Sequence, residues 1–226
     1  MPARLERATS PEVGRPPLVL VPVGSIEQHG PHLPLDTDTA IAVAVAGGAA
    51  RELDAWVAPP LSYGSSGEHQ SFAGTSSIGT GVLVHTLVEL VRSMRTWAGA
   101  VLFVNGHGGN VTALRAAVEQ LLDEGHRVGW VACATESDVA GGLHAGRTET
   151  SLMLHLRPHD VRLHRAEAGN TQPLSEILPA MRVGGIASVS ANGVLGDPAG
   201  ATPEEGAAVL ATMITDVVIA GEKVRG

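Results

Sequence analysis

Short apolar runs alternate with longer segments of helical periodicity along most of this chain. Such apolar runs are typical of strands that are buried on both faces of a sheet. They occur at residues 18–23, 54–58, 100–104 and 128–134. Apolar spacing and alanine-rich composition predict helices at residues 39–53, 78–97, 111–124, 149–156 and 203–220. This alternation predicts an α/β fold: a single-domain three-layer α/β/α sandwich with a mainly parallel sheet.

Three segments lack this regular pattern. Residues 1–17 carry mixed charges and prolines, so we expect a flexible N-terminal tail ahead of a domain that spans residues 18–226. Residues 63–75 form a loop rich in Gly and Ser, and loops of this length are usually functional or mobile. Residues 160–200 have the character of a loop, with one strand expected at residues 186–190. Thr202 is the expected N-cap of the last helix.

Composition and charge narrow the class of protein. The 226 residues are 44% hydrophobic but include only 2 Phe and 1 Tyr, so the core must consist of Ala, Val, Leu and Ile. A net charge of −8 argues against a nucleic-acid partner, which needs a basic surface. The single cysteine, Cys133, excludes an intramolecular disulfide. Because neither a signal peptide nor a long apolar stretch is visible, we expect a cytoplasmic protein without a membrane span.

The first polar cluster follows the first predicted strand. It contains Glu27, His29, Asp36 and Asp38, and carboxylates with imidazole are the ligands that suit zinc, iron or manganese. The alternative is a solvated polar loop. Such a loop needs no imidazole beside a carboxylate, so we favour a metal site.

Two further polar clusters follow later strands. His107 lies in a glycine-rich turn at residues 105–110, which could instead hold a phosphate, although it lacks the spacing and the lysine of a P-loop. His144 and Glu149 flank the start of a helix, where Glu149 alone could be a capping carboxylate. Ligands of parallel sheets bind outside the carboxyl ends of the strands. We therefore expect the three clusters to meet at one edge of the sheet.

Together these segments resemble the creatininase family of metal-dependent amidohydrolases over about residues 18–220. The resemblance is carried by Asp38, by Glu68 and His69, and by residues 24–34, 72–75, 105–110, 144–154 and 193–198. It implies two divalent ions, zinc, iron or manganese. One would be held by Glu27, Asp38 and His107, and the other by His29, Asp38 and Glu149, with Asp38 bridging.

The chain departs from the family pattern at one position. Creatininase carries a glutamate two residues after the histidine that matches His107, and this chain has Gly109 there. Glu149 is the expected replacement ligand. Asp36 matches a non-ligand position and is read as a helix cap or a neighbour of the ligands, and His32 as structural.

The resemblance also implies a mechanism. A hydroxide shared by the two ions would attack an amide carbonyl, with His144 as the proton shuttle and Glu68 and His69 as further catalytic candidates. A plain hydrogen bond to the ligands is the alternative role for His144. No serine or cysteine lies in a nucleophile context.

Within the family, the resemblance favours members that remove a C-terminal dipeptide from a modified precursor peptide, and it implies a homo-oligomer. The alternatives are hydrolysis of a small cyclic amide or a formamide, or a non-catalytic module that only binds metal or ligand. Creatininase closes its site with loop tryptophans, and none lies near Leu143, which argues against creatinine. We expect specificity to depend on residues 63–75, 135–146 and 165–185.

Overall fold

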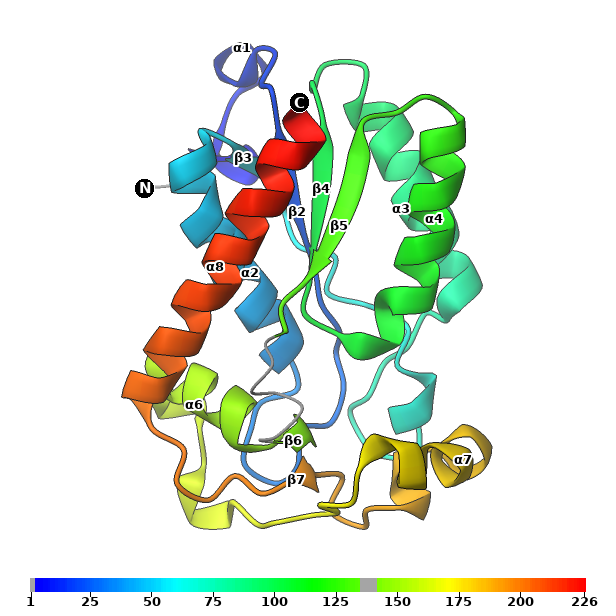
Figure 1. The fold of residues 1–226 in the computed structure, drawn as a ribbon, viewed down its shortest axis with the longest axis vertical. Coiled ribbons are helices and arrows are strands. Elements are labelled where there is room, and N and C mark those ends of the chain that lie inside the picture. Colours follow the sequence, from blue (N-terminus) through cyan, green and yellow to red (C-terminus); the bar gives the residue numbers. More distant parts are fainter. Residues whose placement is uncertain (1–2, 135–141) are drawn as a thin grey trace.

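A parallel five-stranded sheet forms the centre of the computed structural model, which describes residues 3–134 and 142–226 (Figure 1). The strand order is β1-β3-β2-β4-β5, with every neighbouring pair parallel. The strands are β1 (Ala3–Arg4), β2 (Val19–Val23), β3 (Trp56–Val57), β4 (Val101–Asn105) and β5 (Val128–Ala132). β2 and β4 are buried throughout, as continuous apolar runs predict for strands covered on both faces.

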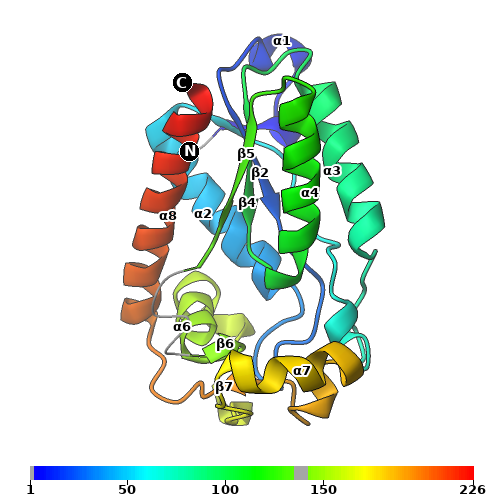
Figure 2. The ribbon, with the colours of Figure 1, turned by 45° about the vertical axis from the view of Figure 1, so that its right-hand side comes forward.

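Helices cover both faces of the sheet, as Figures 1 and 2 show. α2 (Thr37–Leu53) and α8 (Pro203–Arg225) contact each other on one face. α3 (Thr80–Met94) and α4 (Val111–Asp123) contact each other on the opposite face. The predicted three-layer α/β/α sandwich with a mainly parallel sheet is confirmed.

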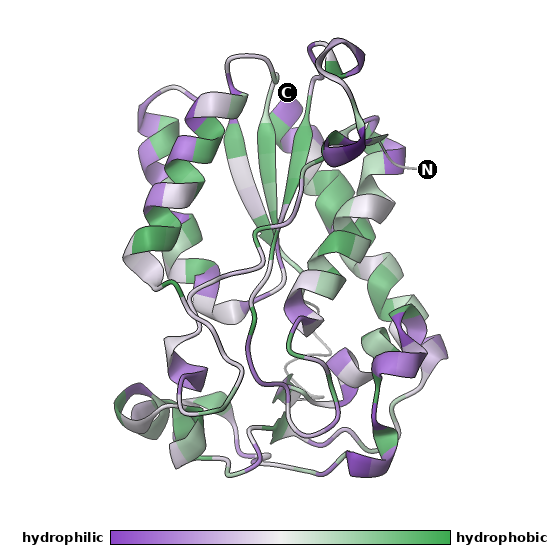
Figure 3. Cartoon of the chain, turned by 180° about the vertical axis from the view of Figure 1, so that it is seen from behind, coloured by the Kyte–Doolittle hydropathy of each residue, from purple (hydrophilic) through white to green (hydrophobic). Residues whose placement is uncertain are grey.

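Two hydrophobic clusters separate the layers because successive strand residues point to opposite faces. Leu20 and Leu102 belong to the cluster under α2 and α8, whereas Val21 and Phe103 belong to the cluster under α3 and α4. Figure 3 shows the strands as mostly hydrophobic, while the helices carry polar residues on their outer sides. Small Ala, Val and Leu side chains fill both clusters, as the scarcity of aromatic residues requires.

A smaller layer lies beyond the carboxyl ends of the strands, at the lower end of Figure 2. β6 (Gly142–His144) pairs antiparallel with β7 (Leu195–Gly196), and α6 (Arg147–Leu156) and α7 (Leu174–Gly184) lie beside them. The strand expected at residues 186–190 is wrong: Ile186–Ser188 is a single 3-10 turn, preceded by α7. Its apolar side chains pack against α7 and β7 instead of entering a sheet.

The ends of the chain contain regular structure. Residues 3–13, predicted as part of a flexible tail, include β1, a 3-10 turn at Leu5–Arg7 and α1 (Ser10–Val13), and β1 pairs with β3. The flexibility of this segment stays a prediction. Thr202 caps α8 as expected, accepting a hydrogen bond from the Glu205 amide at 3.1 Å. Among the described residues, no helix has the length and apolar character that a bilayer-spanning segment needs.

Candidate metal centre

The polar residues that follow β2 and β4 meet at the carboxyl edge of the sheet. Glu27 and His29 lie in the loop after β2, Asp38 lies in the first turn of α2, and His107 follows β4. β2 and β4 are paired neighbours, so their loops emerge side by side. All four side chains are buried. The expected convergence of these clusters is confirmed.

Asn110 holds these loops together. Its side-chain Nδ2 donates to the Gly24 carbonyl at 3.0 Å and to Asn105 Oδ1 at 3.2 Å, while its Oδ1 accepts from the Ser65 amide at 2.8 Å. One buried amide therefore joins the loop after β2, the turn after β4 and the loop at residues 63–75. The glycine-rich turn acts here as a scaffold for His107.

Two triads of potential ligands share Asp38. In one triad, the ligand atoms of Glu27, Asp38 and His107 lie within 4.8 Å of one another, and in the second those of His29, Asp38 and Glu149 do. Asp38 Oδ1 is 3.0 Å from His29 Nε2, and Asp38 Oδ2 is 3.2 Å from His107 Nδ1. These are the two groupings that the family resemblance implies, each with one imidazole and two carboxylates.

The donors of this centre fit divalent cations. Glu27 Oε1 and Asp38 Oδ2 are buried, and neither atom accepts a hydrogen bond of good geometry from a described residue, although His69 Nε2 and His107 Nδ1 lie 3.3 and 3.2 Å away. A buried carboxylate oxygen without a partner is costly unless a cation neutralises it. His29 Nδ1 lies 3.1 Å from the Glu27 carbonyl and can donate to it, which leaves Nε2 facing Asp38. This is the ring orientation that a metal-ligating histidine usually has.

The carboxylates and imidazoles shift one another's pKa. Burial alone would raise the pKa of Glu27 and of Asp38, but His107 beside Glu27 and His29 beside Asp38 outweigh it and lower both. Burial opposes protonation of His29, yet Asp38 and Glu149 raise its pKa to about 10. The centre without metal therefore retains protons that a cation must displace.

Glu149 lies in the first turn of α6, but its side chain bonds the chain ahead of the helix. Its Oε2 accepts a hydrogen bond at 2.5 Å from the amide of Ala145, which precedes the N-cap residue Gly146. The same side chain belongs to the triad with His29 and Asp38. Burial raises the pKa of Glu149 to about 7. The hydrogen bond from Ala145 thus fixes the orientation of a potential metal ligand.

Gln28 links the two histidines next to the triads. Its Nε2 lies 2.9 Å from His69 Nδ1, 3.0 Å from His144 Nε2 and 3.0 Å from the Gly193 carbonyl, and its Oε1 accepts from the Gly30 amide at 2.9 Å. His144 Nε2 also lies 2.7 Å from the Gln28 carbonyl, which can only accept, so this nitrogen carries the proton. The amide then donates to His69 Nδ1 and Gly193.

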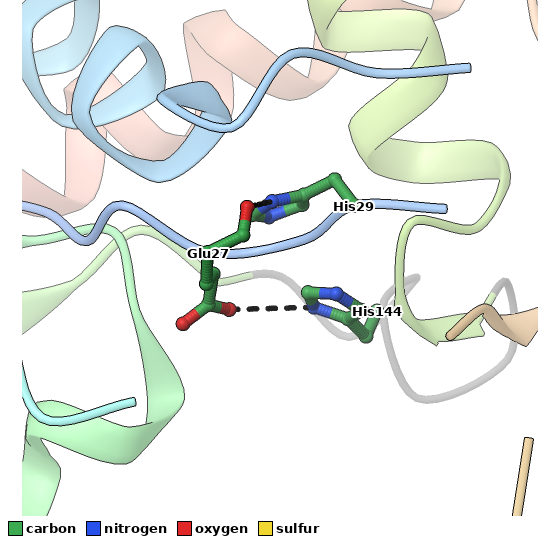
Figure 4. Close-up of side chains that lie close together, drawn as sticks. All are labelled: Glu27, His29 and His144. Atoms are coloured by element: carbon green, nitrogen blue, oxygen red, sulfur yellow. Dashed lines mark hydrogen bonds and ion pairs between the residues drawn. The ribbon is translucent and has the colours of Figure 1, made fainter. Parts of the chain in front are cut away.

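With these tautomers, one unprotonated and one protonated histidine nitrogen face Glu27. His144 Nδ1, left unprotonated, lies 3.7 Å from Glu27 Oε1, a contact drawn in Figure 4. His69 Nε2, left protonated, lies 3.3 Å from the same oxygen. Burial lowers the pKa of His69 to about 4 and that of His144 well below its ordinary value. Both rings are therefore neutral, one offering a proton and one able to accept it.

Glu68 occupies space beside Gly109. Its Oε1 lies 3.6 Å from His107 Nε2, and burial raises its pKa. A Cβ atom at Gly109 would lie 2.3 Å from the Ser65 carbonyl, 2.4 Å from His107 Nε2 and 2.6 Å from Glu68 Oε1. The family glutamate expected at this position cannot fit here. A carboxylate from residues 63–75 lies there instead.

Asp36 and His32 lie outside the triads, as predicted. Asp36 lies at the N-cap position of α2, as expected, but its side chain makes no capping bond. Its Oδ2 accepts a hydrogen bond from Arg157 at 2.8 Å instead. His32 is buried, and its Nε2 is 2.9 Å from Thr150 Oγ1.

The sequence interpretation missed Gln28 and two serines. Ser25 Oγ donates to Glu27 Oε2 at 2.8 Å and contacts Ser66 Oγ, which lies 3.3 Å from His107 Nε2. All three are buried and orient potential ligands. For Gln28, a signal was present: it stands between Glu27 and His29. Ser66 carried none, because it lies far from His107 in sequence.

A cleft of about 630 Å³ opens onto this centre. Glu68, His69, His107 and His144 line one side, and residues of α7 line the other. All three segments expected to govern specificity contribute to its lining: residues 63–75, residues 165–185 and, through Leu143 and His144, residues 135–146. Residues 135–141 of the third segment lie outside the described residues.

A buried cluster of carboxylates and imidazoles at the carboxyl edge of an α/β/α sandwich, open to a cleft, defines a metal-dependent hydrolase. The creatininase family model, described as creatinine amidohydrolase, matches residues 6–220. The chain belongs to the creatininase family.

The curated relatives of this chain include proteins named as peptidases and a protein named as a creatinine amidohydrolase. The mycofactocin precursor peptide peptidase of Mycolicibacterium smegmatis is 56% identical over 88% of this chain and 81% of its own length. The protein of the same name from Mycobacterium tuberculosis is 53% identical over 89% and 83%. Creatinine amidohydrolase of Pseudomonas putida is 30% identical over 66% and 67%.

Solved structures confirm the fold. A tryptophan-to-alanine mutant of creatininase has a TM-score of 0.83 at 25% identity, covering 100% of this chain and 99% of that chain. A structure described as creatininase Mn has a TM-score of 0.80 at 25% identity, covering 97% of each chain. A glutamate-to-glutamine mutant described as Zn-Zn type has a TM-score of 0.79 at 25% identity and covers 97% of each chain.

Proposed function

We propose that this chain is a dinuclear metal-dependent peptidase that removes a C-terminal dipeptide from the modified mycofactocin precursor peptide. The observation that carries the proposal is the pair of ligand triads sharing Asp38 beneath an open cleft. The identity of 53–56% to peptidases of that name, over most of each chain, supports the substrate.

Glu27, Asp38 and His107 would hold one divalent ion, and His29, Asp38 and Glu149 the other. Bound there, two such ions activate water for attack on an amide and polarise its carbonyl. The Zn-Zn and Mn creatininase structures support zinc or manganese, and the same donors suit iron.

The remaining side chains have distinct tasks in amide hydrolysis. His144 Nδ1 is unprotonated and faces the centre, so it can take a proton from the attacking water and deliver it to the departing nitrogen. The Gln28 carbonyl holds that ring by accepting a hydrogen bond from Nε2. His69 Nε2, beside Glu27, keeps this carboxylate oriented. Glu68 lies at the mouth of the cleft, next to His107, where it can contact the substrate backbone.

The residues that line the cleft favour a peptide substrate over creatinine. Its far wall consists of Leu174, Leu178 and Met181 from α7, and its described lining contains no tryptophan. Trp56, Trp97 and Trp130 pack against the core under α3 and α4. A ring-shaped small amide has no aromatic partner here, whereas an extended chain has an apolar surface to cover. Assembly into a homo-oligomer and a cytoplasmic location stay predictions.

The test incubates the metal-loaded chain separately with the modified precursor peptide, with creatinine and with a formamide, and follows each by mass spectrometry. We expect release of a C-terminal dipeptide from the peptide, and no turnover of the other two compounds. Turnover of creatinine or the formamide, with the peptide left intact, would assign the small-amide activity instead. If no compound is hydrolysed although two metals are bound, the peptidase proposal fails.

A further inference from the structure

A second cavity, of about 580 Å³, adjoins the cleft over the metal centre. The two cavities share three lining residues, Leu143, Leu174 and Leu195. Leu143 comes from β6, Leu195 from the neighbouring strand β7, and Leu174 from the start of α7. These elements lie together beyond the carboxyl ends of the sheet strands in Figures 1 and 2. A ligand that fills the cleft can therefore continue past the three leucines into the second cavity.

Beyond the leucines, the second cavity is lined by polar side chains. Asn170, Thr171 and Gln172 follow one another along its wall. Thr171 and Gln172 are exposed, and the structure gives the Thr171 hydroxyl no hydrogen-bond partner among the residues it describes. Hydroxyl and amide side chains both donate and accept hydrogen bonds, as the main-chain amides of a peptide also do. This lining therefore suits the main chain of a peptide.

The charged residues of the second cavity argue against an ionic ligand. Arg147 is the one lysine or arginine in its described lining, and its Nε already donates to both carboxylate oxygens of Glu205, at 3.0 and 2.8 Å. A phosphate or another anion would have to compete with that ion pair. Asp197 is the one carboxylate in the described lining, and its Oδ1 accepts from the Ala199 amide at 2.9 Å. A single carboxylate is too few for a divalent cation, which takes several ligands.

The cleft over the metal centre is too small for a whole precursor peptide. Its volume of about 630 Å³ is that of a site for a drug-sized ligand, which corresponds to a few residues of peptide. A peptidase holds two parts of its substrate, the fragment that leaves and the chain that remains, on opposite sides of the cleaved bond. The remaining chain must therefore leave the cleft, and the second cavity is a route that offers it hydrogen bonds.

We propose that the second cavity binds the part of the precursor peptide that lies N-terminal to the cleaved bond. The inference rests on the proposed peptidase function and adds where the retained chain is held. The residues next to the cleaved bond contact Leu143, Leu174 and Leu195, and the main chain ahead of them forms hydrogen bonds with residues 170–172. A small amide would occupy the cleft alone, so contacts in the second cavity select for an extended peptide.

The experiment shortens the modified precursor peptide from its N-terminus and leaves its C-terminal end unchanged. A long peptide keeps about six residues ahead of the cleaved bond, which extend over ~20 Å, and a short peptide keeps about one. Initial rates of fragment release give kcat and KM for each. We expect wild-type enzyme to hydrolyse the short peptide with kcat/KM about 10-fold lower, mainly through KM, because the lost contacts bind the ground state and the transition state equally.

An A199W variant fills the second cavity, and an A211W variant is the matched control. Ala199 is exposed and lines this cavity, whereas Ala211 is exposed on α8, outside the lining of both cavities. We expect A199W to hydrolyse the long peptide with the kcat/KM that wild type shows for the short one, and A211W to match wild type. On the short peptide the three enzymes should agree, because that peptide does not reach the second cavity.

Wild-type enzyme that hydrolyses the long and the short peptide with equal kcat/KM would overturn the inference while leaving the peptidase function intact. An A199W variant that still prefers the long peptide as strongly as wild type does would overturn it as well. If A199W does not fold, the comparison of the two peptides with wild type decides alone. Failure of wild type on both peptides, with a formamide or creatinine hydrolysed, would remove the proposed function and this inference with it.

Discussion

Gln28 and His144 contact each other twice: the side-chain amide and the backbone carbonyl of Gln28 lie 3.0 and 2.7 Å from His144 Nε2. The carbonyl fixes the proton on that nitrogen, and the amide is then committed to His69. Gln28 thereby decides which nitrogen carries the proton in His69 and in His144, the two rings that lie beside Glu27.

A Q28E variant tests this arrangement. A carboxylate cannot donate a hydrogen bond to His69 Nδ1, so the His69 proton must move from Nε2 to Nδ1. The negative charge of the carboxylate also raises the pKa of both His69 and His144. We expect kcat to fall by about 10- to 100-fold and the acidic limb of the pH–rate profile to move upward, with metal content unchanged. A Q70E variant, changed at an exposed position next to His69 in the loop at residues 63–75, should match wild type. An unaltered pH profile in Q28E would show that Gln28 does not set these tautomers.

Removing Asp38 should remove both metals. Asp38 is the residue that the two triads described above share, so D38A leaves each of these two with two ligands; the third close group, Glu27, His29 and His144, lacks it. We expect elemental analysis to find less than one ion per chain and activity to be lost. D36A is the matched control, since Asp36 pairs with Arg157 at the surface and such pairs contribute little. A D38A protein that retains two metals would contradict the bridging role.

Gly109 and Gly108 offer a paired test of the space around His107. A methyl group at position 109 would collide with the Ser65 carbonyl and His107, whereas no atom of the described residues lies within 4 Å of one at position 108. We expect G109A to lower the free energy of unfolding by about 1–3 kcal/mol and to reduce metal content. G108A should leave both nearly unchanged. Thermal melts and elemental analysis measure the two effects, and equal behaviour of the variants would contradict the geometry.

Metal uptake should release protons in a pH-dependent number. With pKa values of about 10 for His29 and about 7 for Glu149, both hold a proton at pH 6, and only His29 does at pH 8. We expect zinc binding to release about one proton fewer at pH 8 than at pH 6, and affinity to rise with pH. Calorimetry in buffers of different ionisation enthalpy counts these protons.

An E149Q variant should lose the change in proton count near pH 7.

The raised pKa of Glu149 also affects the stability of the metal-free protein. Because the pKa of Glu149 is raised above its ordinary 4.5, the stability it contributes is complete below that value and is lost as the pH rises through 7. If the proton count is the same at pH 6 and pH 8 in wild type, Glu149 does not titrate in this range.

The sequence predicted those parts of the molecule that depend on local pattern. Buried apolar runs identified β2 and β4, and the rule that strand ends collect ligands placed Glu27 and His107 together. α7 was missed because Pro179 stands inside it and Gly184 ends it, two residues that normally interrupt helices. Tertiary packing stabilises α7 as a helix, because Ile177 is buried against Ile186 and Leu195.

The details of the site depend on contacts between distant segments. Ser66 reaches His107, and Glu68 fills the space beside Gly109, only after the loop at residues 63–75 folds over the turn that follows β4. No spacing rule connects residues so far apart in sequence. The tautomer-setting contacts of Gln28 likewise require Gly193 and His144, which come from the second sheet and its neighbouring loop.

The α7 wall of the cleft rests on its own small hydrophobic cluster of Ile177, Ile186 and Leu195, separate from the two clusters that flank the sheet. Substitutions at distant, independent sites have nearly additive effects. Changes in this wall therefore cost the main core little. Natural variation can rebuild the substrate-facing surface while the metal-binding edge of the sheet stays intact, so one scaffold can acquire new amide substrates through a single replaceable helix.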